Sequence, residues 1–386
     1  MSTFGNVTIA KTQEEREAIY RFRYQIYVGE LKRDYPDADH EHKWLHDDDD
    51  ESEYAVNFYT GTCDNITGAM RLLLWPPGKI PEHYFQLFSM KTFPGIEQLT
   101  TSELGRLMIR PDQRGNAIFP SLMCAMYEYL VIKEAQLCFL YCVPGLVKHY
   151  RKSIGARPYS APLIAAGSST GIPMIVITSD SGYFKRTGAL FADLSEQYFD
   201  SGNIPKLDTS AFRDVIEGES VPIKLDKDAI WKAFQEQLLE NESSAPTFLK
   251  SLPAETLKKL TSSGFILTVS ANDVVAKERT EEREVYVILK GVFEVVSRNK
   301  RLAILEKGDL FGEVAFFTEA GQRSASVRAM SGGELLVLRR NFLKELTRSD
   351  PDAGFQILTN MGGVMAQRII DLNRALSVEL FLHQKD

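Results

Sequence analysis

The sequence predicts an α+β protein of two domains: a mixed α/β sheet domain, then an antiparallel β jelly roll that ends in a long helix. Three observations lead to this prediction. The chain has 386 residues, 44% of them hydrophobic, and a single core stops growing at about 250 to 300 residues. Helix-like and strand-like segments alternate through residues 1–190. Short strands between Gly, Asn and Asp turns fill residues 248–338, as in a small antiparallel barrel.

The domain boundaries follow from where these patterns change. We expect the first domain at residues 1–200 and the second at residues 247–386. Between them, residues 201–246 form a predicted linker in which periodicity weakens. WKAFQEQLLEN reads as a connecting helix there, and NESSAP as a flexible joint.

The elements of the first domain follow from hydrophobic periodicity. Pro111 and Gly115 interrupt the pattern before the second helix, and Gly155 ends the third. The predicted strands are residues 54–61, 66–75, 103–110, 137–143 and 172–179, and the predicted helices are residues 13–32, 118–135 and 145–155.

The second domain combines short strands with one long helix. The predicted strands are residues 265–270, 284–291, 292–297 and 334–340, and the final helix covers residues 352–380. That helix repeats apolar residues with heptad spacing, as Leu358, Met365 and Leu372 illustrate. This spacing fits packing against the barrel and equally a two-stranded seam in a homodimer.

Composition limits the classes of function. Formal net charge is −7 and no run of five Lys or Arg occurs, so sequence-independent attraction to nucleic acid or anionic lipid is disfavoured. No apolar run approaches the roughly 18 residues of a membrane span, and the start lacks a signal-peptide core. We therefore expect a soluble, cytoplasmic protein. The cysteines lack metal-ligand spacing, so no metal site is predicted; they are Cys63, Cys124, Cys138 and Cys142.

One stretch near the C-terminus pairs an acid with a base. FGEVAFFTEAGQRSASVRA, residues 311–329, places Glu313 ten positions before Arg323. Gly312 permits close backbone approach, and the amides of the turn after it suit an anion. Arg323 adds a fixed positive fork, while Glu313 suits sugar hydroxyls. A ligand with a phosphate and a ribose accounts for both charges; a structural ion pair without a ligand is the alternative.

This stretch, with EVYVILKGVFEVV upstream, resembles the cyclic-nucleotide-binding domain family, close to the catabolite activator protein. The resemblance implies that Glu313 holds the ribose 2′-OH and that Arg323 holds the cyclic phosphate of cAMP or cGMP. The residues implied in binding are Gly312, Glu313, Val314, Ala315, Arg323, Ser324, Ala325 and Asn373. No winged helix-turn-helix follows the long helix, so we expect a sensor that does not bind DNA and whose output lies upstream.

In the first domain, a strand, a Pro/Gly break and a helix follow one another at ELGRLMIRPDQRGNAIF. A helix N-terminus beside an arginine attracts a pyrophosphate. With YRKSIGA downstream, this segment resembles the acyl-donor loop of the GNAT acyltransferase superfamily, although two of its glycines are absent. The donor-binding residues that the resemblance implies are Ile109, Arg114, Gly115, Asn116 and Ala117.

Five charged positions make the resemblance more specific. FRYQIYVGEL, an acidic loop, GAMRLLL and ELGRLMI together resemble the acyl-homoserine-lactone synthases and the related N-acyl amino acid synthases. The five positions carried over are Arg23, Asp48, Arg71, Glu103 and Arg106. A buried ion-pair network with no catalytic role is the alternative interpretation of this set.

The chemistry implied is attack of an amine on an acyl thioester. Glu103 is the candidate general base, and backbone amides near Ile109 would stabilise the oxyanion. Arg71 and Arg106 would clamp a carboxylate or a phosphate, and Tyr150 would protonate the leaving thiolate. Acyl-CoA and an acyl carrier protein thioester both remain open as donors. Four basic residues suit an acidic carrier protein, namely Lys148, Arg151, Lys152 and Arg157.

These inferences predict a cyclic-nucleotide-regulated N-acyltransferase that acts on a small amine resembling an amino acid. Two alternatives stay open. One is a cAMP-regulated protein lysine acetyltransferase, and the other is a non-catalytic signalling protein that senses cyclic nucleotides.

Overall fold

The computed structural model describes residues 6–383 except 32, 34, 36, 167–168, 202–203, 218–220, 222, 225–226, 240–246, 250, 281 and 319–321. The chain divides into two compact units, Met1–Val221 and Pro222–Asp386. The residues expected to form the linker are shared between these units, since 201–221 belong to the first and 227–239 to the second. The NESSAP joint lies outside the described residues.

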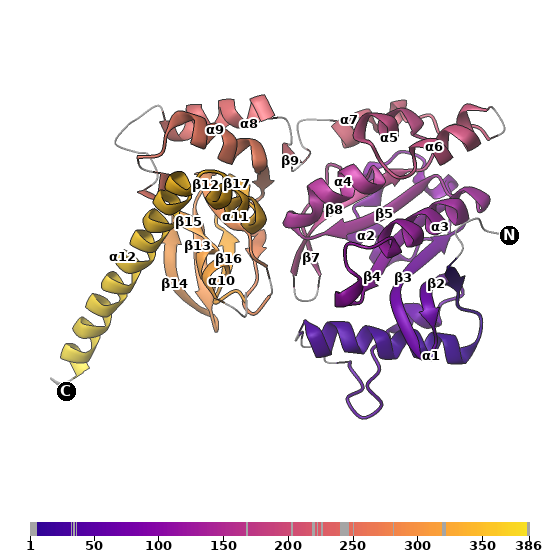
Figure 1. Cartoon of the computed structure of the whole chain (residues 1–386), viewed down its shortest axis with the longest axis horizontal. Helices are drawn as coiled ribbons and strands as arrows, with labels where there is room; N and C mark the ends of the chain where they lie inside the picture. The colour runs from indigo at the N-terminus through magenta and orange to yellow at the C-terminus, as the bar shows by residue number, and fades with distance from the viewer. Residues whose placement is uncertain are drawn as a thin grey trace. The chain divides into compact units, whose positions relative to one another are not determined.

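The first unit is built on an eight-stranded sheet with the order β1-β2-β3-β4-β5-β8-β6, and β7 pairs with β8 (Figure 1). Neighbouring strands are antiparallel except β4 and β5, which are parallel. The strands are β1 Val7–Ile9, β2 Ala55–Thr62, β3 Asn65–Trp75, β4 Thr101–Ile109, β5 Leu137–Cys142, β6 Arg157–Pro158, β7 Ile164–Ala166 and β8 Ser169–Ile177.

Helices and short turns complete this unit. Thr12 caps the first helix, because its hydroxyl accepts from the Glu15 amide while the Glu15 carboxylate accepts from the Thr12 amide. The helices are α1 Gln13–Tyr24, α2 Glu82–Leu87, α3 Ile118–Ile132, α4 Val147–Ile154, α5 Ser181–Thr187, α6 Ala192–Ser195 and α7 Arg213–Glu217. The irregular turns are η1 Gln25–Glu30, η2 Asp48–Glu51, η3 Met90–Thr92, η4 Ile96–Gln98, η5 Pro111–Gln113, η6 Pro144–Leu146, η7 Glu196–Asp200 and η8 Ser210–Phe212.

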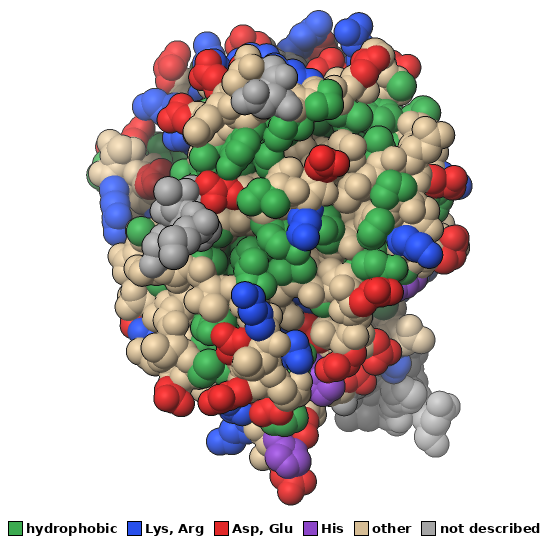
Figure 2. Space-filling view, turned by 90° about the vertical axis from the view of Figure 1, so that its right-hand side faces the viewer, with side chains coloured by type: hydrophobic (Ala, Val, Ile, Leu, Met, Phe, Trp, Pro, Cys, Tyr) green, Lys and Arg blue, Asp and Glu red, His purple; other side chains and the backbone are tan. Residues whose placement is uncertain are grey.

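Two apolar clusters hold this unit together. One packs α1 against β2, β3 and β4 through residues such as Ile19, Phe22 and Met108. The other packs aromatic side chains such as Trp75 of β3, Tyr84 of α2 and Phe139 of β5 against aliphatic side chains of β8. The face of the unit shown in Figure 2 has hydrophobic side chains near its centre. Acidic and basic side chains are intermixed around them, so the described residues of that face form no broad area of one charge.

The second unit has two antiparallel sheets, with orders β15-β12-β17-β10-β9 and β11-β16-β13-β14. This arrangement confirms the predicted jelly roll, and the mixed sheet of the first unit confirms the predicted α+β class. The strands are β9 Ile223–Lys224, β10 Phe265–Val269, β11 Val274–Ala276, β12 Val285–Lys290, β13 Phe293–Ser297, β14 Lys300–Leu305, β15 Leu310–Phe311, β16 Ser326–Ala329 and β17 Gly333–Leu338.

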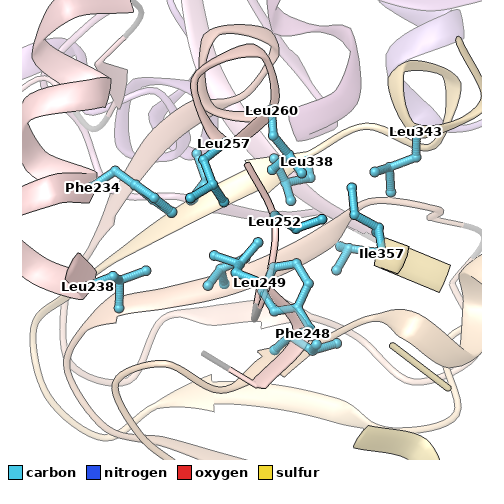
Figure 3. Close-up of a cluster of buried hydrophobic side chains, with 14 of the residues drawn as sticks. Phe234, Leu238, Phe248, Leu249, Leu252, Leu257, Leu260, Leu338, Leu343 and Ile357 are labelled. Carbon is cyan, nitrogen blue, oxygen red and sulfur yellow. The ribbon is translucent and has the colours of Figure 1, made fainter. Parts of the chain in front are cut away.

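Helices pack against the larger of these sheets. They are α8 Lys227–Phe234, α9 Ala254–Ser263, α10 Glu313–Phe317, α11 Arg340–Ser349 and α12 Pro351–His383, with the turns η9 Gln235–Leu239 and η11 Thr247–Leu249. Their apolar side chains meet in one cluster, and Figure 3 labels Phe234, Leu260, Leu338 and Ile357 within it. Among the described residues, the long helix α12 joins this core through Ile357, Leu358, Met361 and Val364.

The heptad positions of α12 therefore divide into two groups. Leu358 packs against the core, whereas Ile369 and Leu372 are exposed.

No helix in the described part of the chain is long and apolar enough to cross a membrane.

A pair of leucine substitutions tests the core of the second unit. Leu260 on α9 is fully buried in the cluster, so Leu260→Ala should lower the free energy of unfolding by about 2 to 5 kcal/mol, because it leaves a cavity. Leu302 on β14 is exposed, and Leu302→Ala should change it by less than about 0.5 kcal/mol. Urea denaturation followed by circular dichroism measures both. Equal losses would contradict this account of the core.

Candidate functional site

The cavity of the first unit lies where β4 and β5 separate. Parallel pairing runs only from Thr101 opposite Leu137 to Glu103 opposite Phe139. Beyond that point, residues 104–109 of β4 and residues 140–143 at the end of β5 both line a cavity of about 780 Å³. The backbone groups that would continue the ladder are thus turned toward the cavity.

A β-bulge explains how Glu103 and Arg106 reach the same cavity. Side chains three residues apart in a regular strand point to opposite faces. Here the register with β3 shifts between Ala69 and Arg71, and Arg106 adopts a positive φ of 53°. Such bulges redirect side chains, and both Glu103 and Arg106 line the cavity.

A network of arginines and aspartates borders this cavity. Arg71 pairs with Asp47, with Asp50 at 3.1 Å and with Asp49 at 3.3 Å. The buried Arg23 donates two hydrogen bonds to Asp50, at 2.5 and 3.0 Å. Each of these arginines thus pairs with at least one aspartate, which offsets the cost of removing its charge from water.

The structure places Asp48, the aspartate singled out from the sequence, away from this network. Asp48 begins the 3-10 turn η2 and is exposed. Side chains three residues apart align along such a turn, so Asp47 and Asp50 point together toward the arginines. Asp47 also accepts from Arg106. The i, i+3 spacing of the two acids was the signal in the sequence that could have identified them.

Glu103 differs from the other carboxylates. It is 5% exposed, and its Oε2 atom has no hydrogen-bond partner among the described residues. Burial raises the pKa of Glu103 to about 7, although Arg71 and Arg106 oppose the shift. Gly105 makes room for it, since a Cβ there would lie 2.6 Å from Oε1.

Of the predicted residues of the first domain, the cavity brings together Arg71, Glu103, Arg106, Ile109, Arg114 and Tyr150. Burial raises the pKa of the Tyr150 phenol, so it stays protonated at neutral pH. Its ring contacts Phe119, with the ring centres 6.4 Å apart. The Tyr150 phenol thus carries its proton in the lining of the cavity.

The predicted donor loop is only partly available for a ligand. Arg114 donates to both carboxylate oxygens of Glu30, at 2.6 and 2.8 Å, and to the Ile109 carbonyl at 3.1 Å. Gly115 has a φ of +89°, which favours glycine, and Ala117 precedes the first turn of α3. Gly115, Asn116 and Ala117 thus shape the start of α3, beside the cavity rather than in its wall.

The four basic residues considered for a carrier protein do not form one surface. Arg157 is buried, pairs with Asp180 and stacks on the Tyr183 ring at 3.7 Å. Arg151 donates to the Tyr183 hydroxyl at 3.2 Å. Lys152 is exposed. Arg157 is excluded from a docking surface, because it is buried and paired.

In the second unit, residues 311–329 are called the cassette below. The turn at its Gly312 has the geometry that the sequence predicts. Gly312 has a φ of +92° and precedes α10. A Cβ at Gly312 would lie 2.5 Å from the Glu284 carbonyl and 2.3 Å from Arg323 Nη1, so only glycine fits. Glu313 and Ala315 are buried, Val314 is half-buried and Ser324 is exposed.

Arg323 is held in place, but part of its guanidinium makes no hydrogen bond to the described residues. It is 4% exposed, donates to the Gly312 carbonyl at 3.2 Å and lies 3.7 Å from Glu282. Its guanidinium sits 5.3 Å from the centre of the Tyr286 ring. Its Nε and Nη2 atoms have no hydrogen-bond partner within the described residues, as expected of a group that awaits an anion.

Sequence reasoning missed Arg368. This residue of α12 pairs with Glu313 at 2.6 Å and donates to the Leu310 carbonyl at 2.6 Å. Asn373, the predicted base contact, is exposed on the same helix. No local pattern marks Arg368, because its partner lies 55 residues earlier.

Comparison with known proteins identifies the kind of domain in each part of the chain. Residues 18–180 match the family model of the N-acyl amino acid synthase FeeM, and residues 266–350 match the cyclic nucleotide-binding domain. The chain therefore combines an acyl synthase-like domain with a cyclic nucleotide-binding domain.

Curated relatives share parts of the chain. The cGMP-dependent protein kinase, isozyme 1, of Drosophila melanogaster is 28% identical over 174 residues, which cover 44% of this chain and 21% of the kinase. The cAMP-activated global transcriptional regulator CRP of Pasteurella multocida is 29% identical over 102 residues, 25% of this chain and 47% of the regulator. This chain thus spans less than half the length of either relative.

Among solved structures, the CoA-dependent acyl-homoserine lactone synthase BjaI has 14% identity and a TM-score of 0.37, covering 48% of this chain and 90% of that chain. The catabolite activator protein of Thermus thermophilus has 23% identity and a TM-score of 0.31, covering 35% of this chain and 63% of that chain.

Two neighbouring aspartates test the charge network. Asp50→Asn should lower the free energy of unfolding by about 3 to 5 kcal/mol, because it leaves the buried Arg23 without a counter-charge. Asp48→Asn removes the same charge from an exposed position and should change stability by less than about 0.5 kcal/mol. Thermal and urea unfolding of both variants measure the difference. Similar stabilities would show that the network does not depend on Asp50.

Proposed function

We propose that this protein is an N-acyltransferase that moves an acyl group from a thioester to a small amine and is regulated by a cyclic nucleotide. The observation that carries the catalytic part is Glu103, a buried carboxyl with an unpartnered oxygen and a pKa raised to about 7 in a cavity that also contains Tyr150. A general base works best when its pKa lies near the operating pH.

The reaction would proceed through attack of the amine nitrogen on the thioester carbonyl carbon. Glu103 takes a proton from the nitrogen as the C–N bond forms. The C–S bond then breaks, and the departing thiolate receives a proton from Tyr150. The products are an amide and a free thiol, so atoms and protons balance.

The arginines have unequal roles in this proposal. Arg71 already pairs with three aspartates and is almost fully buried, so it organises the site. The Arg106 side chain is 25% exposed and lines the cavity. Arg106 is therefore the cation that would receive a substrate carboxylate or phosphate.

The donor is either acyl-CoA or an acyl carrier protein thioester. Arg114 would have to exchange Glu30 for a phosphate to bind a donor, while the amides at the start of α3 are suited to one directly. Kinetics with matched acyl-CoA and acyl carrier protein substrates distinguish the two donors.

Regulation would act through the second unit. A cyclic nucleotide would place its phosphate at Arg323 and its ribose hydroxyl at Glu313, where Arg368 is now bound. Its binding would break the contact between α12 and the cassette and shift the population of α12 conformations.

The pH dependence of the reaction tests the base. Because Glu103 must be deprotonated to accept a proton, kcat/KM should fall tenfold per pH unit below about pH 7 and level off above it. Glu103→Gln should lower kcat by about 10²- to 10⁴-fold. Initial rates across pH 5.5–9, with thiol release as the readout, measure both. A wild-type profile that is flat across this range would exclude Glu103 as the base.

Calorimetry tests the sensor. We expect cAMP or cGMP to bind the wild-type protein, Arg323→Ala to abolish binding and Arg368→Ala to tighten it by about 5- to 50-fold, since a competing ion pair is removed. Weaker binding by Arg368→Ala would show that Arg368 contacts the nucleotide instead. Acyl transfer that is unchanged by saturating nucleotide would rule out the regulatory part.

Two other functions predict different results. A protein lysine acetyltransferase would prefer acetyl-CoA and a peptide acceptor over longer acyl thioesters and small amines. A non-catalytic signalling protein would bind the nucleotide and keep its cellular output after Glu103→Gln. Mass spectrometry of products with short and long acyl donors separates these cases.

A further inference from the structure

The acidic loop contains one carboxylate that the arginines do not fully occupy. The Asp49 side chain is 28% exposed and lines the cavity. Its Oδ2 atom accepts from the Tyr84 hydroxyl at 2.6 Å and from Arg71 Nη2 at 3.3 Å. No hydrogen bond from the described residues reaches its Oδ1 atom, so that oxygen can accept one from a ligand.

Tyr84 fixes the position of Asp49. The tyrosine belongs to α2 and is 7% exposed. Its ring packs against Trp75 at 4.9 Å and lies nearly parallel to Phe88 at 6.3 Å. Burial and the nearby Glu103 raise the pKa of its phenol, so the hydroxyl stays protonated and donates to Asp49. A carboxylate held this way needs no reorganisation when a ligand arrives.

Glu103 faces the same part of the cavity. Its Oε2 atom is buried and has no partner among the described residues, and the negative charge of Asp49 contributes to its raised pKa. Asp49 and Glu103 both line this cavity, and each has an oxygen that receives no hydrogen bond from the described residues. An ammonium group, with three N–H donors and a positive charge, satisfies both.

We propose that Asp49, held by Tyr84, binds the ammonium group of the acyl acceptor and presents it to Glu103. This inference rests on the proposed acyltransferase function. The ammonium donates one hydrogen bond to Asp49 Oδ1 and another to Glu103 Oε2. Transfer of a proton to Glu103 leaves a neutral amine that is still held by Asp49, with its lone pair free to attack the thioester. Glu103 releases this first proton to water, and it then accepts the proton that nitrogen loses as the C–N bond forms.

Asp49 also interacts with Arg71 and Tyr84, and these contacts allow the bound ammonium group to lose a proton. An isolated carboxylate would stabilise the ammonium form and oppose its deprotonation. Here Arg71 and the Tyr84 hydroxyl both act on Oδ2, so the field at the amine is weaker. The acceptor is thus selected as a cation, and Glu103 converts it to a nucleophile.

Steady-state kinetics of the full-length protein test the role of Asp49. Asp49→Asn should raise KM for the amine by about 10- to 100-fold, the value of a hydrogen bond to a charged group. KM for the acyl donor should stay within about twofold. Tyr84→Phe, which keeps the carboxylate, should raise the amine KM less than Asp49→Asn. Glu51→Gln is the matched control, because it removes a charge from the exposed end of the same turn, and it should leave all constants unchanged.

The pH profile separates a direct role from a structural one. Because the Asp49 charge raises the pKa of Glu103, Asp49→Asn should move the acidic limb of kcat/KM to lower pH. Loss of structure would lower the rate without this shift. An inhibitor that lacks the amino group but keeps the rest of the acceptor should bind wild type and Asp49→Asn equally.

An unchanged amine KM in Asp49→Asn would overturn the inference while leaving the acyltransferase proposal intact. If the wild-type protein transfers no acyl group to any amine, the proposed function fails. Calorimetry with the twenty amino acids then still decides the role of Asp49. Amine binding that is lost in Asp49→Asn and retained in Glu51→Gln supports the role. The role is overturned if Asp49→Asn binds the amine as tightly as the wild type does, or if the wild type binds no amine.

Discussion

The first unit depends on one constraint: an arginine that is buried in a protein must find a carboxylate. Arg23 and Arg71 lie inside the unit at 1% and 3% exposure, and the acidic turn η2 supplies their counter-charges. This pairing fixes the loop against the sheet. It also occupies most of the carboxylates around the cavity, so Glu103, which has no direct ion pair with an arginine among the described residues, has a pKa raised by burial.

The position of Glu103 in turn depends on a break in regular strand pairing. β4 and β5 pair over only three residues before they separate, and the bulge that follows Glu103 directs Arg106 into the opening. Gly105 leaves space for the Glu103 carboxylate. A continuous, regular sheet would fill the cavity with backbone and turn Arg106 to the opposite face. The candidate chemistry therefore depends on irregularity at one point in the sheet.

The second unit uses the same kind of interaction for another purpose. Glu313 has a close partner, Arg368, whereas Arg323 lies 3.7 Å from Glu282 and keeps two buried nitrogen atoms without hydrogen bonds among the described residues. The two charged residues of the cassette thus differ in how fully the protein itself satisfies them. Because Arg368 belongs to α12, the carboxylate of the cassette is linked directly to the longest helix of the chain.

Local patterns in the sequence predicted much of this protein. Hydrophobic periodicity predicted the longer strands and helices of both units, Gly312 with Glu313 and Arg323 marked the cassette, and the resemblance to known synthases pointed to Glu103 as the candidate base. The sequence alone thus determined the types of the longer elements, since these follow from short-range periodicity, and it supplied the candidate residues of both sites. Only the tertiary structure decided that Asp47 and Asp50 face the arginines in place of Asp48, that Arg114 pairs with Glu30 and that Arg368 reaches Glu313. These pairings join residues up to 84 positions apart, and their geometry depends on how turns, bulges and helices pack, which no local pattern encodes.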